Sequence, residues 1–441
     1  MSGHQIRPQD YSYPPEQQAI AEAERDLLGR QLTALGHTER FTMQRNAARR
    51  RDQPSRFDIV SFEGVVNEPA YVKDERLVHA LDGEGIAWFG VDRAEAAEAD
   101  FYQRRRNATT ELAPIHVVCQ GRSVIKGDSS PEPTDRRLAF SDRIVADLAE
   151  SEPARVAVID TGVTAEVRRD QWLAGLIRRP DTEDQPGNID ELDSARDTDT
   201  LLDLGAGHGT FVAGIVQQVC PSARITAYRA LDTDGVGRED LLADTLIEAA
   251  EGGQEIIVLS LGTTTADGEP PLALRQAMRR LAVAHPDVLV IAAAGNDGTE
   301  TPMWPAAFKN VVAVAALTAD GRGAEWSSRG DWIDCSTVGE GIVSTFVDGT
   351  EATQGGSSTF GPDSWAMWTG TSFAAPQVAG AVARLVQANR DQGWTPRQAY
   401  AALIAGKSGL PGYGQLIPVL PGTARPEGFA FPEQTAAPLQ T

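Results

Sequence analysis

The chain has 441 residues, of which 41% are hydrophobic and 23% are charged, a composition typical of soluble globular proteins. Its formal net charge of −22 argues against nucleic acids and anionic membrane surfaces as partners, because both would repel it. No apolar run of about 18 residues occurs, so we expect no membrane-spanning segment.

The N-terminus and the cysteines bear on the cellular compartment. The first residues lead into polar sequence without an apolar run, so we expect no secretory signal. Cys119, Cys220 and Cys335 are odd in number and far apart, which indicates neither a disulfide framework nor a metal-binding spacing. We therefore expect a cytoplasmic protein.

Residues 1–55 are predicted to form a helical, partly flexible N-terminal region. Small and apolar residues recur at nearly helical spacing from Glu16 to Leu35 and predict one amphipathic helix. Arginines gather between Met43 and Arg56. This run can be a solvated charged surface or can contact an acidic partner, so a protein partner through this region stays open.

Residues 56–150 are predicted to form a small α/β domain and a linker, neither with a readable role. The stretches Phe57–Phe62 and Ile115–Cys119 are strand-like, and the charged sequence between them favours helix. The run Ser129–Thr134 is typical of a linker, and Ser141–Leu148 of a short helix. The main domain boundary is therefore predicted near residue 150.

From residue 151 to about 420, strands alternate with helices, which is the pattern of a mostly parallel sheet covered by helices. The predicted strands are Arg155–Asp160, Arg224–Ala230, Glu255–Leu261, Val288–Ala293 and Val311–Ala316. The predicted helices are His208–Val219, Glu239–Glu251, Pro271–Ala284 and Ser372–Asn389. Residues 421–441 are rich in Pro, Ala, Gly and Glu and are predicted to be disordered.

Three polar residues stand at the edges of these elements. Asp160 ends a strand before a turn, where a structural cap and a functional acid are equally open. His208 is flanked by glycines at the start of a helix, so that neighbouring backbone or a ligand can approach it closely. Asn296 follows another strand, either as a turn residue or as a donor to an oxyanion.

Ser372 begins the last predicted helix, and by itself it reads most simply as a helix cap. However, acyl transfer requires a nucleophile, a base, an acid that orients the base, and an oxyanion donor. Ser372, His208, Asp160 and Asn296 supply those four residue types. Free N–H groups at a helix start would also favour a developing oxyanion.

The motifs around these residues resemble those of the subtilisin-like serine protease (subtilase) family. The matching stretches are Asp160–Gly162, His208–Gly214, Ala294–Asn296 and Gly370–Pro376, and the resemblance covers about Ala154 to Leu416. It implies an α/β, three-layer subtilisin-like fold with a mostly parallel central sheet. The smaller N-terminal α/β region lies outside it.

The resemblance also implies a role for each residue. Ser372 would attack the scissile carbonyl, His208 would carry the proton, Asp160 would orient His208, and Asn296 would bind the oxyanion together with the Ser372 N–H. An extended substrate would pair with two backbone edges beside a primary side-chain pocket. The implied substrate-binding residues are Gly235, Gly237, Ser260, Leu261 and Gly262 for the edges, and Ala293, Ala294 and Gly295, together with Asn296, for the pocket wall.

Two departures from the family are visible. The helix His208–Val219 leads directly into the next strand, without room for the calcium loop of many relatives, and we expect no metal and no cofactor. The Gly- and Ser-rich stretch Val347–Met367 reads either as a mobile lid beside the site or as a plain surface loop.

Two functions remain open at this stage. The first is an intracellular serine endopeptidase that acts on a restricted protein or precursor-peptide substrate. The second is a catalytically silent peptide-binding or scaffold protein with a protease fold. The complete quartet favours the first, and residues 1–150 would then be a propeptide or, as we prefer, a regulatory or recognition domain.

Overall fold

The computed structural model describes residues 59–62, 72–81, 84–91, 111–114, 116–120, 130–137, 152–179, 187–193, 200–265, 268–353 and 356–423. The helices predicted over Glu16–Leu35 and Ser141–Leu148, the basic run Met43–Arg56 and the tail from residue 424 lie outside these residues. The chain divides into two compact units.

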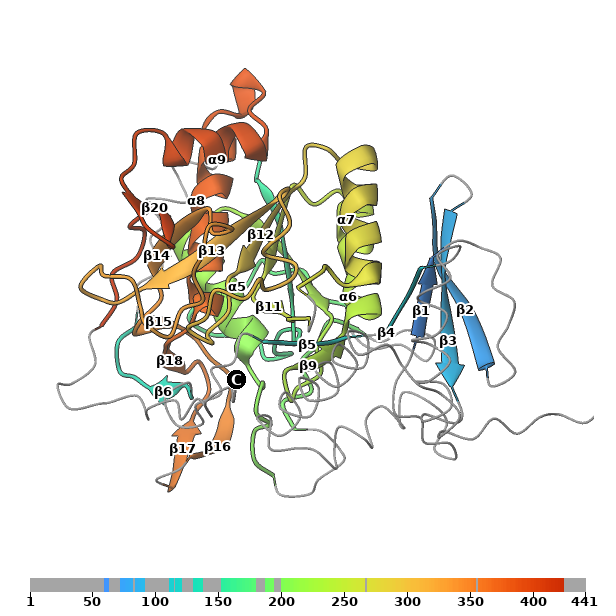
Figure 1. The fold of residues 1–441 in the computed structure, drawn as a ribbon. Helices are drawn as coiled ribbons and strands as arrows, with labels where there is room; N and C mark the ends of the chain where they lie inside the picture. The colour runs from blue at the N-terminus through green and yellow to red at the C-terminus, as the bar shows by residue number, and fades with distance from the viewer. Residues whose placement is uncertain are drawn as a thin grey trace, which may run out of the picture. The chain divides into compact units, whose positions relative to one another are not determined.

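The larger unit comprises Cys119–Val236, Gly252–Gly262 and the chain from Asp287 onward, and is built on an eight-stranded sheet (Figure 1). The strand order is β19-β20-β14-β13-β12-β10-β7-β8, and neighbours run parallel except for the pair β19–β20. The strands are β7 (Arg155–Asp160), β8 (Arg224–Arg229), β10 (Ile256–Leu259), β12 (Leu289–Ala293), β13 (Val311–Leu317), β14 (Cys335–Val338), β19 (Gly409–Leu410) and β20 (Gly414–Leu416).

The predicted α/β class and the mostly parallel sheet are confirmed. Apolar runs such as Val156–Ile159 are buried, as strands covered on both faces require. Three strands, β14, β19 and β20, were not predicted, because they are short and carry few consecutive apolar residues.

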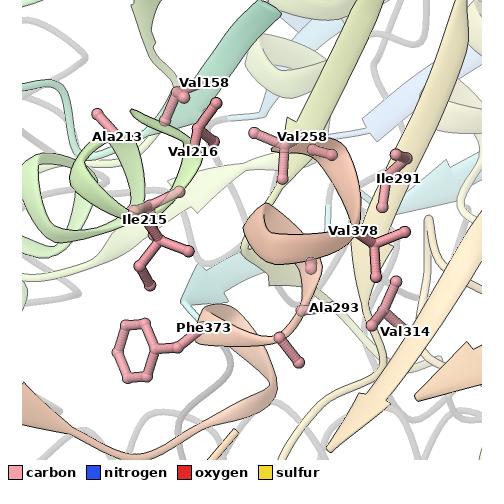
Figure 2. Close-up of a cluster of buried hydrophobic side chains, with 14 of the residues drawn as sticks. Val158, Ala213, Ile215, Val216, Val258, Ile291, Ala293, Val314, Phe373 and Val378 are labelled. Atoms are coloured by element: carbon pink, nitrogen blue, oxygen red, sulfur yellow. The ribbon is translucent and has the colours of Figure 1, made fainter. Parts of the chain in front are cut away.

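Two helices pack on the sheet and form the core of this unit. They are α5 (His208–Val219) and α8 (Ala375–Ala388). Figure 2 shows Ala213, Ile215 and Val216 of α5 gathered with Val378 of α8 and with strand side chains such as Val258. A third helix, α9 (Pro396–Ile404), begins with a capping box between Thr395 and Gln398.

The nucleophile motif differs from its prediction as the start of one long helix. Thr371–Phe373 forms a separate 3-10 turn, η2, and α8 begins only at Ala375. Pro376 has no N–H to donate to the carbonyl of Ser372, four residues earlier, so the α-helical pattern cannot include Ser372. Instead, the Ser372 carbonyl oxygen accepts a hydrogen bond from Ser260 Oγ at 2.7 Å.

The stretch Val347–Met367 is not the loop that the sequence predicts. It forms a hairpin of β16 (Gly349–Thr353) and β17 (Gly356–Phe360), followed by β18 (Trp365–Trp368), which pairs with β15 (Ile342–Thr345) and with β6 (Glu132–Pro133). At the hairpin's base, the guanidinium of Arg168 donates to the carbonyl oxygens of Phe346 and Ser364, both at 3.0 Å. Arg168 is itself 4% exposed and paired with Asp170. The prediction of a loop is therefore wrong, whereas a lid role for this stretch stays a prediction.

The smaller unit contains a four-stranded antiparallel sheet in the order β2-β3-β1-β4. The strands are β1 (Ile59–Phe62), β2 (Val72–Leu81), β3 (Glu84–Val91) and β4 (Glu111–Pro114). The helix-favouring reading of the middle of this region is thus wrong in part, because antiparallel strands accept charged residues on one face. The unit also holds α6 (Glu239–Glu251) and α7 (Leu272–Ala284), which pack against each other. Both segments were predicted to be helices.

The predicted domain boundaries stay predictions. However, two segments before residue 150 pair with strands of the larger unit. They are β6, described above, and the end of β5 (Val117–Gln120), which the sequence analysis placed in the N-terminal domain.

Candidate active site

Asp160 and His208 meet where β7 ends and α5 begins. His208 Nδ1 lies 2.7 Å from Asp160 Oδ1, and the two residues are 2% and 0% exposed. The Thr161 N–H also donates to Asp160 Oδ1, at 2.8 Å. A buried carboxylate held this way fixes the imidazole with a proton on Nδ1, so that Nε2 can accept a proton from a nucleophile.

Glycine allows the two segments to approach this closely. A Cβ on Gly209 would lie 1.9 Å from the carbonyl oxygen of Gly162, so no side chain fits there. Gly207, directly before His208, has φ of 77°, a conformation that glycine adopts without strain. The glycines beside His208 thus serve close backbone contact, as their position in the sequence predicts.

Ser372 lies in the same cavity as His208, at the centre of η2. The Ser372 hydroxyl donates a hydrogen bond to the Ser260 carbonyl oxygen, at 3.3 Å, rather than to His208. A rotation about the Cα–Cβ bond of Ser372 redirects this hydroxyl, and catalytic hydrogen bonds commonly tighten only when substrate binds. The aromatic rings of Trp368 and Phe373 flank the His208 ring, with centroids at 5.4 and 5.5 Å.

Asn296 is oriented by its own amide oxygen. Its Oδ1 accepts hydrogen bonds from the backbone N–H and the hydroxyl of Thr371, both at 2.9 Å. Because two donors fix Oδ1, the Nδ2 amide group is left as the donor on the side of the cavity that Asn296 lines. An amide N–H group beside a nucleophilic serine can stabilise an oxyanion.

One buried acid in this site is not among the predicted site residues. Asp190 is 3% exposed, and its Oδ2 accepts hydrogen bonds from the Thr161 hydroxyl at 3.0 Å and from the Gly207 N–H at 2.9 Å. It therefore links the residue after Asp160 to the residue before His208. Burial raises the pKa of the Asp190 carboxyl to about 6, against the opposing effect of these hydrogen bonds.

The predicted substrate edges are already paired with the chain itself. Leu261 and Gly262, which form β11, pair antiparallel with Gln120 and Cys119 of β5. The Gln120 N–H also donates to the carbonyl oxygen of Gly235, at 3.1 Å. The groove between the two edges is therefore occupied by β5, and Gln120 reaches the catalytic cavity. The remaining predicted edge residues are Ser260, which contacts Ser372 as described, and Gly237, which lies in β9 (Val236–Arg238).

The predicted pocket wall is largely closed. Ala293, Ala294 and Gly295 are buried, and the Ala293 side chain packs in the core cluster (Figure 2). Of the predicted wall residues, Asn296 lines the catalytic cavity and the other three do not. The cavity is lined by Gln120, Ser130, Leu204, His208, Asn296, Glu351, Trp368, Thr369, Gly370, Ser372 and Phe373.

Neither a metal centre nor a membrane span occurs in the described part of the chain. Within these residues, no group of three or more His, Cys, Asp or Glu side chains is placed to hold a metal ion. None of their helices combines the length and apolar character needed to cross a bilayer.

Comparisons with known proteins agree with this geometry. The model of the Subtilase family matches residues 152–415. The thermophilic serine proteinase of Bacillus sp. (strain AK1) is 34% identical over 256 residues, which cover 55% of this chain and 54% of that protein. Thermitase of Thermoactinomyces vulgaris is 32% identical over 55% of this chain and 78% of its own length.

A third relative is the intracellular serine protease of Paenibacillus polymyxa, 30% identical over 57% of this chain and 72% of its own. The chain thus spans about half the length of the first relative and about three quarters of the other two. Because the family model covers most of the chain and includes all four motif residues, the chain belongs to the subtilase family of serine proteases.

Proposed function

We propose that the protein is a serine endopeptidase that cleaves peptide bonds through Ser372, His208, Asp160 and Asn296. The observation that carries the proposal is the buried 2.7 Å contact between Asp160 and His208, because His208 lines one cavity with Ser372 and with the oriented amide of Asn296. These groups supply the nucleophile, the base, the orienting acid and the oxyanion donor that acyl transfer requires.

The reaction proceeds in two steps. Ser372 Oγ attacks the carbonyl carbon of the scissile bond while His208 Nε2 takes its proton, and the Asp160 carboxylate stabilises the resulting imidazolium. The Asn296 amide and a backbone N–H of the nucleophile turn bind the oxyanion. His208 then gives its proton to the leaving amine, and water hydrolyses the acyl-enzyme by the same route.

A fluorophosphonate probe tests this proposal, because it reacts with activated serines. We expect covalent labelling of the wild-type chain and complete loss of labelling in Ser372→Ala, with Ser328→Ala as a buried-serine control that keeps it. Loss of peptide hydrolysis should accompany the loss of labelling. A folded wild-type protein that is never labelled would support the alternative, a silent peptide-binding or scaffold protein.

We further propose that the substrate is a restricted protein or precursor peptide. Support comes from β5, because a substrate strand has to displace Cys119 and Gln120 to pair with Leu261, Gly262 and Gly235. A substrate that competes poorly with β5 would be excluded. The partner predicted for the N-terminal region stays a prediction.

A cytoplasmic location is also part of the proposal. It is supported by Cys119, Cys220 and Cys335, none of which forms a disulfide bond within the described residues. The similarity to the intracellular protease of P. polymyxa points the same way. Fractionation of cells that carry a tagged chain would test it, and recovery in the medium would contradict it.

A further inference from the structure

We propose that Met303 fills the primary side-chain pocket, so that the protein cleaves after residues with small side chains, namely glycine, alanine or serine. This inference rests on the proposed function and names its substrate class. It follows from the space between two backbone segments beside Ser372.

The two segments are the predicted substrate edge at Gly262, in β11, and the predicted pocket wall at Gly295, which follows β12. A Cβ on Gly262 would lie 2.8 Å from Met303 Cγ, and a Cβ on Gly295 would lie 2.6 Å from Met303 Cε. The same methionine therefore touches both backbones, with its inner methylene against one and its terminal methyl against the other. It spans the gap in which a substrate side chain would sit.

Met303 is held in this position by its neighbours. It is 7% exposed, and its carbonyl oxygen accepts a hydrogen bond from the Ala307 N–H at 2.8 Å. The next residue, Trp304, is 8% exposed and packs on Phe308 with ring centroids 4.7 Å apart. The segment that carries Met303 is thus anchored by the residues that follow it.

The shape of the catalytic cavity agrees with a filled pocket. Among the described residues that line it are Ser372 and Asn296, but not Gly262, Gly295 or Met303. The residues that line this cavity include Asn296 but neither of the two glycines. A substrate carbonyl can reach Ser372, whereas a side chain longer than a methyl or hydroxymethyl group meets the methionine.

The size of the discrimination follows from packing. A pocket filled by protein excludes larger substrate side chains by about tenfold or more for each methylene it cannot accept. Methionine is unbranched and flexible, so it can move aside at a cost rather than block absolutely. We therefore expect a strong preference and not complete exclusion.

The experiment uses the full chain and fluorogenic peptides that differ only in the residue before the scissile bond: glycine, alanine, leucine or phenylalanine. Active sites are counted by fluorophosphonate titration, and kcat/KM is measured for each peptide. For wild type we expect the alanine or glycine peptide to exceed the phenylalanine peptide by at least about tenfold. Met303→Ala and Met303→Gly should open the gap and reverse the order.

Met278→Ala is the matched control, because Met278 is also a buried methionine, 3% exposed, in α7. It loses similar packing and should keep the wild-type preference. Should Met303→Ala fail to fold, Met303→Val removes less volume and should still raise the relative rate for leucine.

Two results would overturn the inference and leave the proposed function standing. One is a wild-type chain that is labelled by the probe and cleaves after phenylalanine as well as after alanine. The other is an unchanged preference in folded, labelled Met303 variants. Failure of the wild-type chain to be labelled at all would instead reject the proposed function, and this inference with it.

Discussion

The catalytic groups around Ser372 are already oriented, whereas the places where a substrate would bind are occupied by the chain itself. On the side of His208 and Asn296, the hydrogen bonds that orient the base and the amide are already formed. On the side of the substrate, β5 occupies the groove between Gly262 and Gly235, and Met303 fills the gap between two glycines. The contrast teaches that the chemistry and the access of substrate are built by separate parts of the chain.

That separation has a thermodynamic consequence. Binding energy from a substrate need not be used to assemble the reactive groups, and can be used to displace β5. Substitutions in the catalytic half should therefore change kcat, whereas substitutions in the groove should change selectivity or the apparent KM. Substitutions on the catalytic side and in the groove each test this separation.

The largest effect is expected in the catalytic half, from Asn296→Ala. Loss of the amide donor should lower kcat by about 10²-fold to 10³-fold, a size measured for such a donor in a member of this family rather than derived from this chain. KM should change little. Steady-state kinetics on a peptide substrate would check this, with Asn389→Ala, at the end of α8, as the control. A large rise in KM with an unchanged kcat would place Asn296 in ground-state binding instead.

A smaller effect, on stability, is expected from the acid that joins the two catalytic segments. The pKa of Asp190 is raised to about 6, so on raising the pH the unfolded chain loses this proton before the native chain does. The stabilising contribution of the protonated group is therefore complete below about pH 4 and is lost as the pH passes 6. Relative to Asp190→Asn, the free energy of unfolding of the wild type should fall by up to about 3 kcal/mol over this window.

Urea unfolding of both proteins between pH 4 and about pH 7 would measure this difference. The side-chain amide of the Asp190→Asn variant does not titrate, so the curve of that variant supplies the reference for all other groups. Parallel curves for the two proteins would mean that Asp190 titrates at its ordinary value in the folded chain.

The smallest effect is expected in the groove, from Gln120→Pro. Proline removes the N–H that donates to the Gly235 carbonyl oxygen, which should weaken the hold on β5 by about 1 kcal/mol. Hydrolysis of a short peptide should then rise roughly fivefold. Gln120→Ala keeps the N–H and separates the backbone effect from that of the side chain. A slower Gln120→Pro enzyme with normal folding would show that β5 supports the groove rather than blocking it.

The sequence predicted the parts of the site that depend on local patterns. The bounds of β7 and α5 agree with their predictions, because β7 is a short run of consecutive apolar residues before a turn, and α5 is a longer run between a glycine-rich start and Pro221. Asp160 and His208 could therefore be placed at the ends of these two elements. Their contact follows from the parallel sheet, which gathers strand ends at one edge.

Other parts depend on contacts between distant segments and left no local sign. Asp190 lies in a run of acids, and only its hydrogen bonds to residues 29 and 17 positions away distinguish it from its neighbours. Nothing in the sequence around Met303 marks it as the filler of a pocket formed by two other strands. The hairpin β16–β17 was hidden because its Gly and Ser residues resemble those of a loop, although cross-strand pairing orders them.

Arg168 has a bearing on how this protein could be recombined with its relatives. Its guanidinium joins the two ends of the hairpin β16–β17, whose strand β16 carries Glu351 into the catalytic cavity. The hairpin is therefore not a self-sufficient module, since the carbonyl groups of Phe346 and Ser364, which flank it, accept hydrogen bonds from a residue well upstream. A chimaera that imports the hairpin and its flanking residues alone would lose both hydrogen bonds from Arg168, and the graft should be made with Arg168 and Asp170 as one unit.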